Sequence, residues 1–323
     1  MRDASQVFIS NSGTEANEAA IKFARKVGRS LEPSGSKHEF VTFQNSFHGR
    51  TMGALSATPN PKYQTPFAPM IPGFKYGNYN DIEQLQSLIT ENTCGVMVEP
   101  IQGEGGVNVA TPEFLSALRK RCNEVGAVLI YDEIQCGLSR TGSLWAHAHP
   151  SLVPTMGDAA HPDIMTTAKA LGNGFPIGAT IVSAKSVGEH IKAGDHGTTF
   201  GGNPLACRVA HHIVGRLASP ELQKSVEDKS AMFVAGFKAL QTQYPHMVKE
   251  IRGRGLILGL QLSEAFGSKA SDIITAARER GLLIISAGEG CLRFVPPLNI
   301  TEDQIETGLN ILEQAFSVVA ASS

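Results

Sequence analysis

A short run of apolar residues that ends in two acids constrains this chain more than any other feature. Residues 128–131 are β-branched or large and uncharged, and glycines bound the run. This pattern predicts a short buried strand over 128–132. In an α/β sheet such a strand delivers its last residues to a ligand crevice, so we expect Asp132 to be an anion held ready for a buried cation. Taken alone, Asp132 and Glu133 are more often part of an ordinary surface turn.

A second apolar run, at 163–168, ends in Lys169 and a glycine-rich turn. A lysine at the end of a buried strand is a candidate Schiff-base former, because desolvation favours its neutral, nucleophilic form. Pyridoxal phosphate requires an acid that pairs a pyridinium nitrogen and a lysine that binds an aldehyde. We therefore predict Lys169 and Asp132 as catalytic residues and pyridoxal 5'-phosphate as the cofactor.

Both stretches resemble those of the class III, or ω-amino-acid, aminotransferases of fold type I, and the resemblance extends to the end of the chain. It implies an α/β fold with a large, mostly parallel sheet domain and a C-terminal α+β domain. We expect these domains at residues 1–212 and 213–323. Members of the family carry a further N-terminal segment, which this chain is expected to lack.

The segment after the first predicted strand combines a glycine with the start of a helix. Ser12 and Glu15 fit a capping box, and small and apolar residues fall on one helix face from Ala16 onward. Unpaired N–H groups and the helix dipole make Gly13 and Thr14 a cradle for a phosphate. The signal alone is weak, but the family's Ser-Gly-Thr-Glu-Ala motif implies that Ser12, Gly13 and Thr14 bind the cofactor.

Residues 47–50 combine an aromatic residue with a glycine and an arginine. The aromatic side chain could stack on a flat ring, and the arginine could bind a carboxylate through two hydrogen bonds. Without context, a core phenylalanine and a solvated arginine explain this stretch better. The resemblance implies that Phe47 stacks on the pyridine face, that His48 also binds the cofactor, and that Arg50 binds the substrate carboxylate remote from the reacting carbon. A polar loop is expected over 59–80 and an amphipathic helix over 81–89.

The strand predicted at 95–98 ends in Glu-Pro-Ile-Gln-Gly-Glu. Its glycines lack the spacing of a dinucleotide loop, so a nicotinamide site is not indicated. The family carries the same stretch, which implies substrate contacts for Glu99 and Glu104. Arg293 matches the family's second carboxylate-binding arginine, although alone it is more often a solvated edge residue. We expect Glu104 to pair with Arg293 until a substrate carboxylate replaces it.

The resemblance implies four further cofactor-binding residues, Ile134, Gln135, Thr198 and Thr199. Ile134 is expected on the ring face opposite the phenylalanine, and Gln135 beside the phenolic oxygen. Thr198 and Thr199 belong to a motif at 197–204, and in the family the second threonine reaches the phosphate of the neighbouring subunit. A homodimer with shared active sites is therefore expected.

Composition excludes several other classes of function. The 28 basic and 30 acidic residues form no long run, so neither nucleic acid nor a membrane is an expected partner. Five scattered cysteines without a CxxC indicate a reducing compartment, and no metal site is expected. The resemblance implies the mitochondrial matrix, with the cytoplasm as the alternative. Residues 145–162, longer than usual for the family, are expected to be a surface loop with an insertion.

More narrowly, the chain resembles acetylornithine aminotransferases. This implies transfer of the δ-amino group of N-acetylornithine to 2-oxoglutarate, giving N-acetylglutamate 5-semialdehyde and glutamate, a step of arginine biosynthesis. Ornithine aminotransferase or another ω-amino-acid transaminase is the alternative within the class. A non-catalytic, truncated partner protein with the cofactor fold is the alternative from another class.

Overall fold

The computed structural model describes residues 3–152 and 161–322 and separates into two compact units. The first comprises Met1–Pro100, Ala110–Leu138 and Trp145–Leu217, and the second Ile101–Val109, Ser139–Leu144 and Ala218–Ser323. The expected boundary at 212–213 falls inside helix α6 (Pro204–Leu217), whereas the units divide after this helix. The segment 101–109 joins the second unit because its backbone and side chains are bonded there: Arg252 Nη1 donates to Gly106 O at 3.2 Å and to Asn108 Oδ1 at 3.0 Å.

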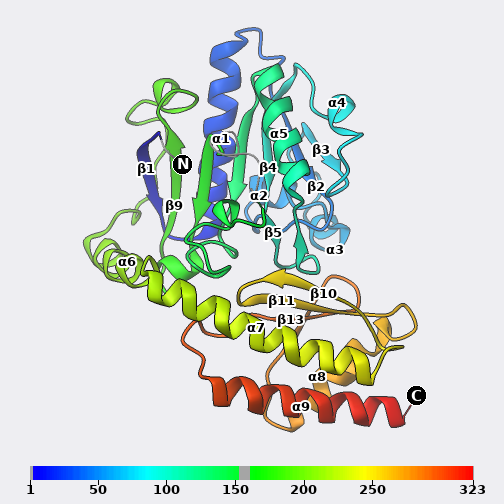
Figure 1. The fold of residues 1–323 in the computed structure, drawn as a ribbon. Coiled ribbons are helices and arrows are strands. Elements are labelled where there is room, and N and C mark those ends of the chain that lie inside the picture. The colour runs from blue at the N-terminus through cyan, green and yellow to red at the C-terminus, as the bar shows by residue number, and fades with distance from the viewer. Residues whose placement is uncertain (1–2, 153–160, 323) are drawn as a thin grey trace. The chain divides into compact units, whose positions relative to one another are not determined.

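A seven-stranded sheet in the order β1-β9-β8-β7-β4-β2-β3 forms the centre of the first unit (Figure 1). The strands from β3 to β8 run parallel, whereas β9 is antiparallel to both β8 and β1. The sheet is therefore mostly parallel, as expected. The strands are β1 (Ala4–Ser10), β2 (Glu39–Phe43), β3 (Phe74–Gly77), β4 (Thr93–Val98), β7 (Val128–Asp132), β8 (Ile164–Thr167) and β9 (Gly178–Ser183).

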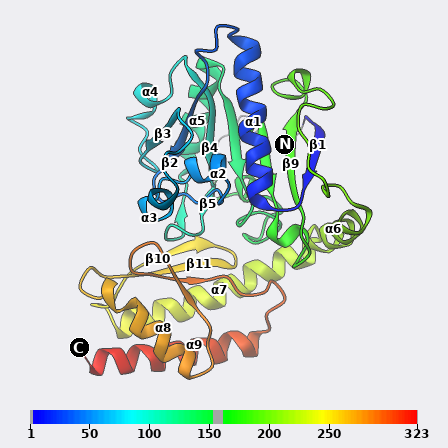
Figure 2. The ribbon, with the colours of Figure 1, turned by 180° about the vertical axis from the view of Figure 1, so that it is seen from behind.

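Helices cover both faces of this sheet, α1 (Gly13–Leu31) on one and α5 (Pro112–Val125) on the other (Figures 1 and 2). In β7, Val128 and Ile130 belong to the core cluster that includes α1, whereas Leu129 and Tyr131 belong to the cluster that includes α5. Side chains alternate along a strand. Asp132, which follows Tyr131, therefore points to the α1 face of the sheet.

Between β2 and β4 the sequence expectations are wrong. The expected loop at 59–80 contains α3 (Pro61–Gln64), a 3₁₀ turn (Thr65–Phe67) and the edge strand β3. Phe74 of β3 stacks on Phe40 of β2, with ring centroids 5.4 Å apart, and such long-range pairing is invisible in a local pattern. The expected helix at 81–89 is a single turn, α4 (Leu85–Leu88), preceded by Gln84, whose side chain bonds to the backbone of Asn78.

The second unit is an antiparallel sheet, β10-β11-β13-β12, with three long helices packed into its core. Gly253 of β10, with φ +105°, lies so close to the neighbouring strand that a Cβ there would be 2.0 Å from Ile257 O, so only glycine fits this position. The sequence did not predict β10. The elements are α7 (Pro220–Gln243), β10 (Val248–Arg254), β11 (Ile257–Leu262), α8 (Ala270–Glu279), β12 (Ile285–Ala287), β13 (Cys291–Phe294), α9 (Glu302–Ala321) and the hairpin of β5 (Ile101–Gln102) and β6 (Asn108–Val109).

No helix within the described residues has both the length and the apolar character needed to cross a membrane.

Candidate active site

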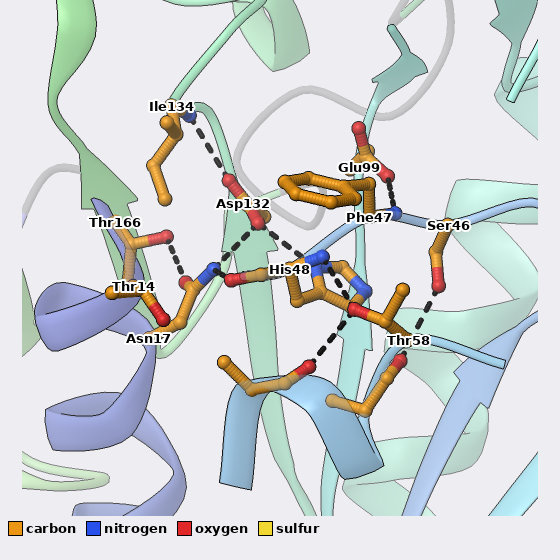
Figure 3. A network of polar contacts seen from close by, with 12 residues as sticks. Thr14, Asn17, Ser46, Phe47, His48, Thr58, Glu99, Asp132, Ile134 and Thr166 are labelled. Atoms are coloured by element: carbon orange, nitrogen blue, oxygen red, sulfur yellow. Dashed lines mark hydrogen bonds and ion pairs between the residues drawn. The ribbon is translucent and has the colours of Figure 1, made fainter. Parts of the chain in front are cut away.

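Asp132, at the end of β7, lies at the centre of a buried polar network (Figure 3). Only 3% of the residue is exposed. Its Oδ2 lies 2.8 Å from both Asn17 Nδ2 and His48 Nδ1, and its Oδ1 accepts a 3.0 Å bond from Ile134 N. Amide and backbone N–H groups can only donate here, so the network matches an ionised carboxylate. Oδ1 keeps acceptor capacity for one further donor.

Asn17 and Thr166 complete this network, and the sequence analysis missed both. Thr166 Oγ1 donates to Asn17 Oδ1 at 2.8 Å, which fixes the orientation of the amide. Asn17 Nδ2 then donates to Asp132 Oδ2 and, at 2.7 Å, to His48 O. An asparagine among the buried residues of α1 was the available signal, because a fully buried amide needs partners.

The tautomer of His48 follows from its surroundings. The residue is 2% exposed, and within the described chain its Nε2 is buried without a hydrogen-bond partner. The carboxylate of Asp132 can only accept, so Nδ1 is the ring nitrogen that donates in the His48–Asp132 contact.

The start of α1 lies at the same end of the sheet as Asp132. Ser12 caps the helix by accepting from Glu15 N, as expected, but the Glu15 carboxylate reaches Asn11 N at 2.9 Å instead of completing the capping box. In the first turn of a helix the N–H groups lack intrahelical acceptors, so those of Gly13 and Thr14 suit an anion. A Cβ on Gly13 would lie 2.9 Å from Ile134 Cδ1, so glycine lets Ile134 pack against the helix start.

Thr198 lies beside this helix start in the same chain. Its Oγ1 lies 3.1 Å from Glu15 Oε1 and 3.0 Å from Asn11 Nδ2. Burial raises the pKa of the Glu15 carboxyl, but hydrogen bonds from Asn11, Ser12 and Thr198 outweigh burial and hold the pKa below its ordinary value. Thr199, in contrast, is exposed.

Lys169 follows β8 in a 3₁₀ turn with φ +34°, an uncommon backbone conformation for a residue with a side chain. Such conformations cluster at functional sites. Thr166 pairs with Asp132 in the sheet, so Lys169 and Asp132 leave the sheet at the same edge. Lys169 is exposed, so the expectation that burial would desolvate it is wrong for the chain by itself. Gln135, at this edge too, is half-buried.

Phe47, Arg50 and Glu99 lie together in the first unit. Glu99, only 5% exposed, accepts a 2.9 Å bond from Phe47 N (Figure 3) and so fixes the backbone of that residue. The Arg50 guanidinium carbon lies 3.7 Å from the ring centroid of Tyr63 and 5.4 Å from that of Phe47. A substrate contact for Glu99 stays a prediction, whereas its bond to Phe47 is a positioning contact.

Glu104 and Arg293 form an ion pair within the second unit. Arg293 Nη1 lies 2.8 Å from Glu104 Oε1, which is the pairing expected from the sequence. Arg293 is 7% exposed, so it is not a solvated edge residue.

The described part of the expected surface loop at 145–162 is partly a buried anchor. His147 is 1% exposed, and its Nδ1 and backbone N both contact Glu133 Oε1, while Ala146 N donates to Glu133 Oε2 at 2.6 Å. The buried Glu133 carboxylate therefore accepts the hydrogen bonds of this segment and anchors it in the protein interior. Residues 153–160, the remainder of the expected insertion, lie outside the described residues. Within the part of the chain that is described, no group of three or more His, Cys, Asp or Glu residues is arranged to hold a metal ion.

The sheet is mostly parallel, and a buried acid, a lysine and a helix N-terminus lie together at one of its edges. This arrangement is typical of aminotransferases of fold type I. Residues 1–316 match the family Aminotransferase class-III, so the chain belongs to the class III aminotransferases, which are pyridoxal-phosphate-dependent enzymes.

Curated relatives include two proteins named mitochondrial acetylornithine aminotransferase. That of Neurospora crassa is 66% identical over 99% of this chain and 67% of its own length, and that of Yarrowia lipolytica is 56% identical over 98% and 72%. Among solved structures, the N-acetylornithine aminotransferase of Stenotrophomonas maltophilia has a TM-score of 0.83 at 39% identity, over 100% of this chain and 77% of that one. The ornithine aminotransferase of Toxoplasma gondii has a TM-score of 0.89 at 34% identity, over 99% and 74%.

Proposed function

We propose that this chain transfers the δ-amino group of N-acetylornithine to 2-oxoglutarate, with pyridoxal phosphate as cofactor, in arginine biosynthesis. The single observation that carries the choice of substrate is the 66% identity, over 99% of the chain, to an acetylornithine aminotransferase. The solved ornithine aminotransferase is 34% identical, so ornithine is the second candidate donor.

The residues of the first unit fit the cofactor. Asp132 has acceptor capacity for a ring N–H, and the start of α1 offers Gly13 and Thr14 N–H groups to a phosphate, with Ser12 beside them. Phe47 and Ile134 supply apolar surface for the two ring faces. Pyridoxal phosphate bound there would supply an electron sink for the substrate carbanion.

The proposed catalytic groups of this chain are the carboxylate of Asp132 and the amine of Lys169. Asp132 would keep a proton on the ring nitrogen, and the hydrogen bonds from Asn17 and His48 hold its carboxylate in place. Lys169 would hold the cofactor aldehyde. The free Lys169 amine would take the proton from the substrate carbon that carries the amino group.

Two arginines would bind the substrate carboxylates. N-acetylornithine reacts at a carbon without a carboxylate, and Arg50 would bind its remote one. Glutamate reacts at a carbon that carries a carboxylate, and Arg293 would bind this group once Glu104 has been displaced. The observed Glu104–Arg293 ion pair supports this switch, because it neutralises Arg293 between the two half-reactions.

A homodimer and a mitochondrial location complete the proposal. Thr199 and its neighbour Phe200, which is 72% exposed, are available to contact a second chain. The relatives from Neurospora and Yarrowia are named mitochondrial, and these names lend no support to a cytoplasmic alternative.

The test is the visible absorbance of the cofactor-loaded protein before and after each amino donor. N-acetylornithine should bleach the band at a concentration at which ornithine does not, and 2-oxoglutarate should restore it. Lys169→Ala should bind the cofactor without the band and without turnover. A wild-type spectrum that no amino donor changes would favour the non-catalytic partner protein, and an equal response to ornithine would favour the second candidate.

A further inference from the structure

The guanidinium of Arg50 lies over an aromatic face. Its central carbon is 3.7 Å from the Tyr63 ring centroid, and the rings of Tyr63 and Phe47 meet edge to face at 84° with centroids 6.1 Å apart. Within the described residues, the Arg50 side chain makes no hydrogen bond or ion pair. A guanidinium that lies over an aromatic ring is attracted to the ring through its own flat face. The N–H donors at the edge of the guanidinium therefore stay available to a carboxylate.

Both partners of this contact are anchored through their backbones. Arg50 N donates to Thr14 Oγ1 at 3.2 Å. Tyr63 lies in α3, which Asn60 caps, and the next residue, Gln64, donates from Nε2 to Leu55 O at 3.1 Å and to Thr58 O at 2.9 Å. The backbone that carries the ring is therefore held in place, and the ring itself packs edge to face against Phe47.

A free arginine side chain loses conformational freedom when it binds a ligand, and this loss weakens binding. A platform that holds the guanidinium beforehand reduces the loss. Because Tyr63 is half-buried and its hydroxyl makes no hydrogen bond within the described residues, the ring face alone supplies this effect.

We propose that Tyr63 is a positioning residue for carboxylate recognition. It holds Arg50 with its donors directed outward and thereby raises the affinity for amino donors whose carboxylate is remote from the reacting amine. This inference rests on the proposed function, because it takes Arg50 as the ligand of that carboxylate.

The experiment compares Tyr63→Leu with the conservative variant Tyr63→Phe in the cofactor-loaded enzyme. The two donors are N-acetylornithine and N-acetylputrescine, which has the same chain without the carboxylate. Tyr63→Leu should raise KM for N-acetylornithine about fivefold, because ordering one free arginine side chain on binding costs about 1 kcal/mol, and leave kcat within about twofold. KM for N-acetylputrescine should stay within about twofold. Tyr63→Phe should restore the wild-type KM for N-acetylornithine.

Binding without turnover provides an independent readout. N-acetylnorvaline carries the carboxylate but no reacting amine, and its dissociation constant can be measured by calorimetry. Tyr63→Leu should weaken it about fivefold, by the same ordering cost of the arginine side chain. In an Arg50→Gln background, Tyr63→Leu should have no further effect, since the platform then has nothing to hold.

The outcomes separate the inference from the function on which it rests. If wild type reacts with N-acetylornithine but Tyr63→Leu raises KM equally for both donors, or not at all, the positioning role is overturned while the proposed function stands. A loss in Tyr63→Phe as large as in Tyr63→Leu would also overturn it, since the hydroxyl would then be the active feature. A wild-type enzyme that does not react with N-acetylornithine would overturn both.

Discussion

Replacing Asn17 by leucine tests the network that holds Asp132. Leucine has the same branched side-chain skeleton as asparagine, with bulkier methyl groups, and the site is 0% exposed, so water cannot readily replace the amide. The substitution removes the bond to the Asp132 carboxylate, worth about 1.5–3 kcal/mol, and leaves the Thr166 hydroxyl and the His48 carbonyl without their amide partner, at about 1–3 kcal/mol each. Burial of the leucine side chain offsets about 2 kcal/mol. The expected loss of unfolding free energy is about 4 kcal/mol.

Urea unfolding of the protein, monitored by circular dichroism, measures this loss. Thr166→Val is the matched control: it removes one neutral bond and should cost about 1–2 kcal/mol. In the double variant the Thr166 hydroxyl is no longer left unpaired, so the combined loss should be smaller than the sum of the single losses by about 1–2 kcal/mol. Asn17→Leu should also weaken cofactor binding. A loss below about 1 kcal/mol, or strict additivity, would refute the hydrogen-bond argument.

Three further predictions concern other buried groups. His147→Ala removes a donor from the buried Glu133 carboxylate and should cost about 2–3 kcal/mol in urea unfolding; a neutral effect would show that the backbone donors suffice. Glu104→Gln leaves Arg293 without its anionic partner and should slow the N-acetylornithine half-reaction relative to the glutamate half-reaction in single turnovers; equal factors would end the switch hypothesis. Burial raises the pKa of the Cys122 thiol from 9.0 to about 12. The thiol therefore ionises first in the unfolded chain, and the urea midpoint should fall as pH rises above about 9. This fall should be smaller in Cys122→Ala; an identical fall would assign it to other groups.

Local patterns predicted a large part of the fold. The strand at 128–132 occurs at the expected residues, and the strand predicted at 95–98 is the last part of β4, because apolar runs and bounding glycines act over a few neighbours. The same reasoning placed Asp132 at a strand end and the start of a helix after Ser12. It failed for β3 and α4, whose form depends on distant partners.

The sequence by itself determined which chemistry-bearing residues lie at strand ends and helix starts. Only the tertiary structure decided which of them meet. Asn17 bonds Asp132, Glu133 holds His147, and Tyr63 supports Arg50. Each contact depends on how strands, helices and turns pack against one another, and no periodicity within a segment encodes that packing. Burial also depends on this packing, which is why Arg293 is buried while Lys169 is exposed.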